Sequence, residues 1–266
     1  MITQKIGAIE YLTAENIGVP HGFTTRYGGV STGHLSSMNI GIHRGDALSN
    51  VAKNYELLGN VIGFDIDDVV ASKQIHSDIV YQVTAADRGG CLIEGASPVC
   101  DALITNVADI ALNVFTADCT PILYHDPVTG AVGAAHAGWR GTAAGIAAKT
   151  VQAMVDAYGC KPENIRAAIG PHIGQCCFET DKDVPDAMVD ALGDEALSYI
   201  TKKGDKYYLD LTQINSAFLR RAGVSHIESC PDCTACQPDR FWSYRRVGVN
   251  RGSQGAIIVC QKEGTR

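Results

Sequence analysis

Three residues have side chains suited to binding a catalytic metal: His76, Cys119 and His136. Catalytic zinc sites keep three protein ligands and leave a fourth tetrahedral position for water or substrate. Imidazole nitrogen and thiolate sulfur together suit a borderline-soft ion such as zinc. The three residues are far apart in the chain, however, so their spacing does not bring them together as it does in a helical His-Glu-x-x-His pair. On residue types alone, a buried cysteine and two hydrogen-bonded histidines are the commoner arrangement.

The same residues permit a different chemistry, that of a metal-free cysteine hydrolase. In that reading Cys119 is the nucleophile and His136 is its general base. Asp118 precedes Cys119, and neighbours on a strand point to opposite faces, so we expect Asp118 to orient a neighbour instead of binding the same ion. We interpret His172, between Pro171 and Ile173, as a polar loop residue.

A possible anion site precedes a predicted helix that begins near Ala143. Gly138 and Gly141 flank Arg140, so free backbone N–H groups and a guanidinium could face one anion there. The alternative is a glycine turn that lets strand and helix pack closely while Arg140 makes a structural salt bridge. Arg26, which precedes a pair of glycines, has the same two interpretations.

The run Cys230, Cys233 and Cys236 resembles part of a zinc or iron–sulfur motif. A closed structural zinc site needs four ligands, and a cluster likewise needs a fourth thiolate. No fourth partner lies nearby in the sequence, so this run predicts no second metal. The adjacent pair Cys176 and Cys177 is interpreted first as buried structure.

Composition sets the broad class. The 266 residues are 45% hydrophobic and 19% charged, which is ordinary for a globular protein and predicts one domain over residues 1–266. The net charge of −7 argues against a nucleic-acid partner, although a few convergent arginines can still bind a small anion. We find no signal-peptide pattern and no apolar run long enough for a membrane span, so we expect a cytoplasmic protein without a membrane partner.

Hydrophobic patterning supplies the elements that must position these residues. Seven short apolar or β-branched stretches predict strands, and four amphipathic stretches predict helices. The strands are expected at residues 79–83, 102–105, 111–115, 122–124, 131–135, 166–169 and 255–259. The helices are expected at residues 50–62, 143–158, 184–192 and 211–222, the last capped by Asp210. Helices and strands do not alternate strictly, so we predict an α+β fold, a single domain with a large mixed β-sheet flanked by helices.

Several motifs occur in a recognisable order over nearly the whole chain, from about Gly22 to Val259. They are Thr24-Thr25-Arg26-Tyr27-Gly28-Gly29-Val30-Ser31, Met38-Asn39-Ile40-Gly41, Gln74-Ile75-His76, Thr116-Ala117-Asp118-Cys119-Thr120-Pro121, His136-Ala137-Gly138-Trp139-Arg140-Gly141 and Ile169-Gly170-Pro171. With these motifs the sequence resembles the laccase-domain family, also called the peptidoglycan editing factor or multicopper polyphenol oxidase-like family. That family includes bacterial purine nucleoside phosphorylases.

The resemblance implies that His76, Cys119 and His136 bind a catalytic metal, zinc or alternatively copper. It implies phosphorolysis of adenosine, inosine, guanosine and methylthioadenosine, with adenosine deamination as a further activity. The substrates would then be a purine nucleoside and phosphate, and Arg26, Asn39 and Arg140 are our candidate substrate-binding residues. Tyr244 stands where the family has histidine, so we assign no acid–base role there.

Two other functions remain open at this point. One is a copper-dependent polyphenol oxidase, although multi-electron oxidation needs several coppers and the sequence offers only one convincing set of three ligands. The other is a non-enzymatic factor that binds a cell-wall precursor and holds a structural ion, as the editing-factor name suggests. The expected function is therefore a zinc-dependent purine nucleoside phosphorylase, with these alternatives to be tested.

Overall fold

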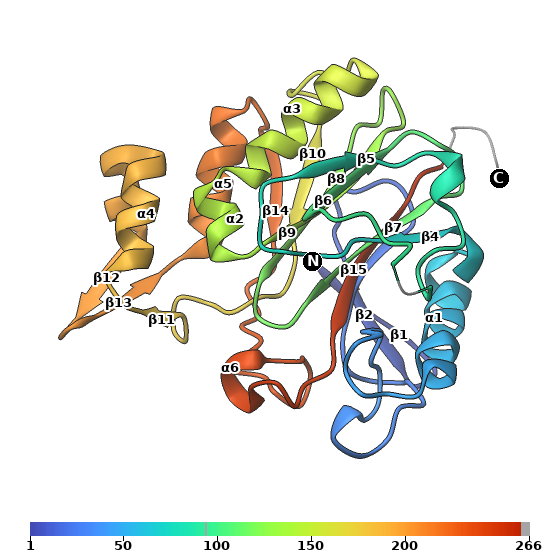
Figure 1. Ribbon diagram of the computed structural model, residues 1–266. Coiled ribbons are helices and arrows are strands. Elements are labelled where there is room, and N and C mark those ends of the chain that lie inside the picture. The colour runs from blue at the N-terminus through green and yellow to red at the C-terminus, as the bar shows by residue number, and fades with distance from the viewer. Residues whose placement is uncertain (94, 262–266) are drawn as a thin grey trace.

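Two six-stranded sheets form the centre of the protein (Figure 1). The computed structural model describes residues 1–93 and 95–261, so the predicted domain end at residue 266 lies outside the described part. The first sheet has the order β1-β2-β3-β15-β7-β4, and the second has the order β14-β10-β8-β9-β6-β5. The α+β prediction of mixed sheets flanked by helices is thereby confirmed.

The first sheet is antiparallel except at its edge, where β4 runs parallel to β7. Its strands are β1 (Ile2–Ile6), β2 (Ile9–Thr13), β3 (His21–Thr24), β15 (Gln254–Val259), β7 (Ala111–Thr116) and β4 (Val69–Ala71). Helix α1 (Leu48–Ile62) covers its outer face, where Val51, Tyr55 and Leu58 join one hydrophobic cluster with Ile257 and Val259.

The second sheet is also mixed, with parallel pairs at both edges, β5 with β6 and β10 with β14. Its strands are β14 (His226–Ser229), β10 (Arg166–Ile169), β8 (Thr120–His125), β9 (Val132–Ala137), β6 (Ala102–Thr105) and β5 (Val80–Gln82). Helices α2 (Trp139–Ala143), α3 (Ile146–Tyr158) and α5 (Leu211–Arg221) pack on its outer face.

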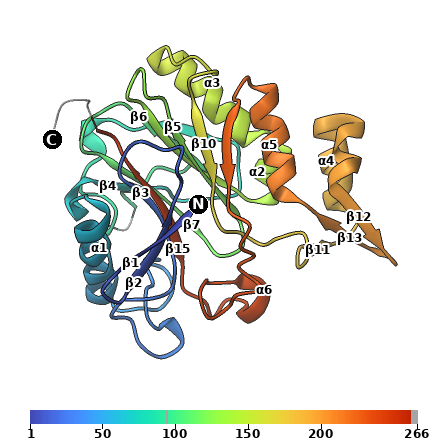
Figure 2. The same cartoon turned by 180° about the vertical axis from the view of Figure 1, so that it is seen from behind.

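The inner faces of the two sheets pack against each other. Leu112, Val114 and Ile258 of the first sheet share a buried cluster with Leu123 and Ala134 of the second. Alternate residues of one strand point to opposite faces, and accordingly Ile257 and Ile258 of β15 belong to different clusters. The result is four layers, helix, sheet, sheet and helices, as the view from behind shows (Figure 2).

A smaller unit extends from one side of these layers (Figure 1). It holds α4 (Asp183–Leu192) and the three-stranded sheet of β11 (Glu179–Thr180), β13 (Lys206–Leu209) and β12 (Ile200–Lys203). Short helical segments complete the described chain: α6 (Tyr244–Val247), η1 (Gly33–Leu35), η2 (Ile66–Asp68), η3 (Ala85–Asp87) and η4 (Gly193–Tyr199). No helix in the described ranges is long and apolar enough to cross a membrane.

The predicted helix 143–158 was wrong at its start. Residues 139–143 form α2, and α3 begins only at Ile146 because Gly145 adopts a left-handed conformation, φ 79°, and separates the two helices. The other end was predicted correctly, since Gly159 is the left-handed C-cap, φ 67°. The predicted Asp210 cap of α5 is confirmed, because its carboxylate accepts a hydrogen bond from the N–H of Gln213 at 3.0 Å.

Candidate metal centre and cavity

The two histidines and the cysteine predicted as metal ligands meet in space. Ligand-type atoms of His76, Cys119 and His136 all lie within 4.8 Å of one another. The two imidazole rings are nearly perpendicular, with centroids 4.9 Å apart. We call this group the His–Cys–His site. Residue types and distances together fit one ion held by three protein ligands.

Three different segments position the ligands. His136 lies in β9 and is buried, Cys119 lies in the tight connection between β7 and β8, and His76 follows β4 on a partly exposed loop. Both connections use left-handed backbone, φ 61° at His76 and φ 96° at Asp118. Non-glycine residues rarely adopt this conformation, and it tends to persist only where surrounding contacts impose it.

Asp101 is the residue that imposes the geometry, and the sequence analysis did not find it. This aspartate is fully buried just before β6, and its Oδ1 lies 2.9 Å from Nδ1 of His136. Its carboxylate also accepts backbone N–H bonds from Ile75, His76 and Ser77 at 3.2, 3.0 and 2.6 Å. One carboxylate therefore orients one ligand directly and holds the loop of another. The only sequence signal was an acidic residue before a buried strand.

Gly138 makes room for the ligands to meet. A Cβ atom added there would lie 2.5 Å from Nδ1 of His76 and 3.4 Å from Sγ of Cys119. The first distance is a severe overlap, so no larger residue fits without displacing His76. A glycine at this point is consistent with a functional close approach of backbone and side chain.

The charged groups of the site favour a proton on His136. Burial lowers the pKa of His136, but attraction to Cys119 and the bond to Asp101 outweigh burial and raise that pKa to about 9. Burial raises the pKa of Asp101, but hydrogen bonds from His136 and Ser77 outweigh it and hold the pKa well below its usual range. Burial and the nearby His136 lower the pKa of His76. In the metal-free protein the proton is thus held on His136, where a metal ion would have to displace it.

The His–Cys–His site opens into a cavity of about 790 Å³. Its lining comes from segments of both large sheets and includes aromatic, apolar and cationic side chains. These are Gly41, Ile42, His43, Arg44, Ser72, Lys73, Gln74, His76, Ile93, Gly95, Ser97, Phe115, Thr116, Ala117, Asp118, Cys119, His136, Trp139, Ile173, Phe178, Leu211, Tyr244, Arg245, Arg251 and Ser253. Small-molecule sites commonly have volumes of roughly 300–1,000 Å³.

Two arginines in this lining, Arg44 and Arg251, meet at one serine, and neither has a carboxylate partner among the described residues. Nε of Arg44 and Nη1 of Arg251 both donate to Oγ of Ser253, at 3.3 and 3.2 Å. Nε of Arg251 is buried without a hydrogen-bond partner. Burial lowers the pKa of Arg251 to about 10, with repulsion from Arg44 as a further cause. We call Arg44 and Arg251 the arginine pair, and its chemistry suits a small anion.

The structure does not place the three predicted substrate-binding residues in the cavity lining. The Arg26 guanidinium bonds the carbonyls of Ser36 and Pro238 and stacks on Trp242, with Cζ 3.9 Å from the ring centroid. Arg140 is exposed and stacks on Trp139 at 4.2 Å. Neither the expected helix entrance at Ala143 nor a salt bridge of Arg140 is present in the described chain. Their role in substrate binding stays a prediction.

Asn39 is buried and holds two segments of the cavity lining together through hydrogen bonds. Its Oδ1 accepts the N–H bonds of Gly41 at 3.1 Å and of Ser253 at 2.9 Å. Gly41 begins the segment that carries Arg44, and Ser253 contacts both guanidiniums. Asn39 therefore fixes the two segments that carry the arginine pair.

Asp118 is not part of the ligand group, as the sequence analysis expected. Its carboxylate accepts bonds from Oγ1 of Thr234 and from the backbone N–H of Arg245, at 2.7 and 2.6 Å. His172, predicted as a polar loop residue, is in fact buried, with its ring bonded to the Gly170 carbonyl and to Thr212. The C-terminal segment that departs from the family pattern does line the cavity, through Tyr244.

This arrangement, two packed mixed sheets with a His–Cys–His site at their edge, defines the class of the protein. Residues 20–261 match the family described as multi-copper polyphenol oxidoreductase laccase. The chain belongs to this laccase-domain family.

Named relatives and solved structures are similar over almost the whole chain. Purine nucleoside phosphorylase YlmD of Geobacillus stearothermophilus is 38% identical over 91% of this chain and 89% of its own. A purine nucleoside phosphorylase of Deinococcus radiodurans is 39% identical over 95% of this chain and 94% of its own. The crystal structure of YlmD from Geobacillus stearothermophilus superposes with a TM-score of 0.92, at 35% identity, over 98% of this chain and 99% of that chain.

Proposed function

We propose that the protein is a zinc-dependent purine nucleoside phosphorylase that cleaves adenosine, inosine, guanosine and methylthioadenosine with phosphate. The observation that carries the proposal is the joint occurrence, in one cavity, of the three-ligand site and the arginine pair. The relatives named purine nucleoside phosphorylase support the reaction class. Deamination of adenosine at the same site belongs to the proposal as a second activity.

The donor set fits zinc. His76, Cys119 and His136 would hold the ion, and Asp101 would keep His136 in the tautomer that leaves its other nitrogen free for metal. The space made by Gly138 lets these ligands approach closely. When bound at such a site, zinc supplies Lewis acidity and lowers the pKa of a bound water or polarises a substrate oxygen.

The arginine pair would bind the phosphate co-substrate. Both guanidiniums are partly buried and lack carboxylate partners in the described chain, so a dianion compensates a charge that the protein leaves unbalanced. Arg251 is also close enough to interact electrostatically with Cys119 and Asp118. Phosphate held by Arg251 would therefore lie beside the His–Cys–His site.

The apolar part of the lining would receive the nucleoside. Phe178, Ile173, Trp139 and Leu211 come from segments of the second sheet and its helices, whereas the arginine pair comes from segments of the first. A purine is flat and aromatic, and stacking against such side chains is favourable. This division would place the base and the phosphate toward different walls, with the ribose between them.

The chain's own groups then account for phosphorolysis. Cleavage of the glycosidic bond develops positive charge on the ribose, which an adjacent phosphate stabilises before it bonds to C1′. The arginine pair fixes the attacking oxyanion and reduces the entropic cost of bringing it to the ribose. Ribose 1-phosphate and the free purine base are the products.

Product analysis tests this proposal. Zinc-loaded protein freed of phosphate is incubated with inosine, with and without added phosphate, and the products are separated by chromatography. We expect hypoxanthine and ribose 1-phosphate only when phosphate is present, and neither product from the His136→Ala variant. Equal base release without phosphate indicates a hydrolase, and undiminished release by zinc-depleted wild-type protein supports the metal-free mechanism of Cys119 and His136 instead.

A further inference from the structure

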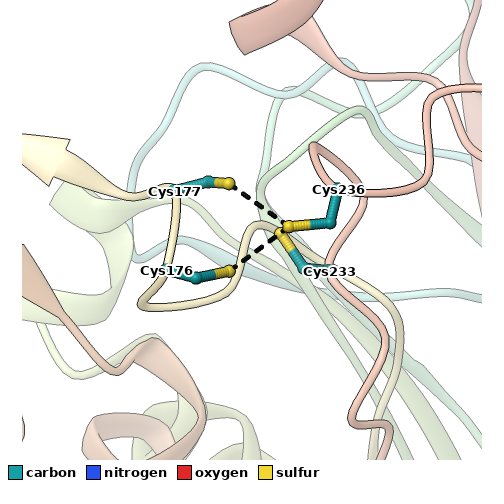
Figure 3. Close-up of side chains that lie close together, drawn as sticks. All are labelled: Cys176, Cys177, Cys233 and Cys236. Atoms are coloured by element: carbon teal, nitrogen blue, oxygen red, sulfur yellow. Dashed lines mark hydrogen bonds between the residues drawn. The ribbon is translucent and has the colours of Figure 1, made fainter.

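Four cysteine side chains converge away from the His–Cys–His site (Figure 3). They are Cys176, Cys177, Cys233 and Cys236, and their sulfur atoms all lie within 4.8 Å of one another. Sγ of Cys236 is 3.5 Å from Sγ of Cys176 and 3.4 Å from Sγ of Cys177. We call this group the four-cysteine cluster. Two of its members thus belong to the run at Cys230, Cys233 and Cys236, and the other two are the distant pair Cys176 and Cys177. That pair is exposed or half-buried, not buried as the sequence suggested.

Two turns bring the sulfurs together. The N–H groups of Cys177 and Phe178 both bond the carbonyl of Gly174 at 3.0 Å, so the chain turns at the cysteine pair. On a strand, adjacent side chains point to opposite faces, but in this turn Cys176 and Cys177 both point toward the facing loop. In that loop the N–H of Cys236 bonds the carbonyl of Cys233 at 3.1 Å.

The surroundings favour a negative charge on the sulfur of Cys233. The backbone N–H of Gly174 donates to Sγ of Cys233 at 3.2 Å, and such bonds stabilise thiolates. The guanidinium of Arg245 donates to the carbonyls of Cys177 and Glu179 at 2.7 and 3.0 Å, and that of Arg246 bonds the carbonyl of Ala235. Two cations therefore lie along the loops that carry the cluster.

The distances select one ion over an iron–sulfur cluster. Four thiolates around one zinc ion at about 2.3 Å form a tetrahedron with edges of about 3.8 Å. The sulfur separations of 3.4 and 3.5 Å at Cys236, with the other separations within 4.8 Å, agree with such a tetrahedron. Cysteines that bind an iron–sulfur cluster are spread over several iron ions and lie further apart.

We propose that Cys176, Cys177, Cys233 and Cys236 bind one structural zinc ion, in addition to the ion at the His–Cys–His site. A closed Cys₄ set leaves no coordination position for substrate, so the role is structural. Cys230, which completes the apparent motif in the sequence, is buried and does not belong to the group. On binding, one zinc ion replaces the thiol protons, and no oxidation is involved.

The proposed ion joins two segments that support the cavity. Thr234, between two of the cysteines, bonds Asp118 at 2.7 Å and, through its N–H, the carbonyl of His172 at 3.0 Å. Phe178, directly after the other pair, lines the cavity. A zinc ion at the cluster therefore fixes the connection next to Cys119 and one wall of the cavity.

Zinc content of the purified full-length chain tests the proposal. By elemental analysis of protein equilibrated with zinc and desalted, we expect two equivalents in the wild type and one in His136→Ala. One is likewise expected in the double variant Cys176→Ala/Cys236→Ala, whose two changes are at exposed positions and spare the core. Cys230→Ala is the matched control and should keep two. The zinc content of the His136→Ala variant reports on the four-cysteine cluster alone. It is therefore independent of whether the protein is a nucleoside phosphorylase.

Replacing zinc with cobalt in the His136→Ala variant identifies the ligand atoms by their absorption spectrum. We expect thiolate-to-cobalt charge-transfer absorption with the intensity of four sulfur ligands, abolished by adding Cys176→Ala and Cys236→Ala. The proposal is overturned if the wild type binds only one equivalent of zinc and the His136→Ala variant binds none. So does an intact mass, measured without reductant, that shows disulfides among these four cysteines in place of bound metal.

Discussion

Asp101 accepts a hydrogen bond from His136, with 2.9 Å between Oδ1 and Nδ1, and both side chains are buried. The same carboxylate accepts the backbone N–H of His76 at 3.0 Å. Two of the three proposed ligands thus depend on one residue that binds no metal itself. Carboxylates in this position orient the imidazole and increase its basicity.

Asp101→Asn should therefore weaken zinc binding while leaving the three ligands in place. Loss of an outer carboxylate commonly costs about 10–100-fold in metal affinity, and we expect a decrease in that range. Competition with a chromophoric chelator measures the affinity. Ser72→Ala, a change in the cavity lining away from the carboxylate, is the control. Wild-type affinity in Asp101→Asn would show that the Asp101–His136 bond does not orient the ligand.

Gly138→Ala should abolish zinc binding at the His–Cys–His site, because the new Cβ would lie 2.5 Å from Nδ1 of His76. The strain is local, so the circular dichroism spectrum should stay unchanged. Gly18→Ala is a suitable control, since its added Cβ would meet the nearest atom at an ordinary 3.5 Å. Equal zinc content in the two variants would mean that the ligands do not need the space at Gly138.

The arginine pair gives a prediction that separates two possible anion sites. Arg251→Gln should raise the KM for phosphate about 10–100-fold, since a hydrogen bond to a charged group contributes roughly 1.5–3 kcal/mol. Arg140→Gln should leave the KM near the wild-type value, because Arg140 is exposed and outside the lining. Saturation kinetics with inosine held constant measure both. A raised KM for phosphate in Arg140→Gln, with an unchanged KM in Arg251→Gln, would instead support the sequence-based prediction that Arg140 binds the anion.

The protonation of His136 predicts how the metal-free protein responds to pH. Its folded-state pKa of about 9 is above the unfolded value of 6.5, so its contribution to stability is complete below pH 6.5 and is lost as pH rises toward 9. Zinc must displace this proton, so zinc affinity should rise over the same interval. Thermal unfolding of zinc-free protein at pH 6.5 and 9, beside His136→Gln, measures the first effect. A wild type that is as stable at pH 9 as at pH 6.5, relative to His136→Gln, would contradict the assignment.

Much of the fold could be predicted because its signals are local. Short apolar or β-branched runs marked strands such as β7 and β15. Asp210 and Gly159 marked helix ends, since a cap depends on the residues beside it. The start of α3 was misplaced because Ala143 and Ala144 favour helix, and only the left-handed Gly145 shows that the chain breaks there. How the two sheets pack on each other depends on contacts between distant segments, and the sequence pattern alone did not predict it.

The site could be predicted only in part. The ligands were found through family motifs, because nothing in the spacing of His76 and Cys119 brings them together. Asp101, Arg44 and Arg251 escaped notice because an acidic or basic residue has no distinctive sequence signal until the fold shows what it faces. The same reason applies to the four-cysteine cluster, whose halves lie on separate turns.

Phosphorus NMR of the zinc-loaded protein with inosine and inorganic phosphate follows phosphorolysis directly. We expect the phosphate resonance to decrease as a ribose 1-phosphate resonance grows, in step with release of hypoxanthine. The new resonance should be absent with His136→Ala. Release of hypoxanthine while all phosphorus stays inorganic phosphate, or conversion of adenosine to inosine with no cleavage of either nucleoside, would contradict phosphorolysis.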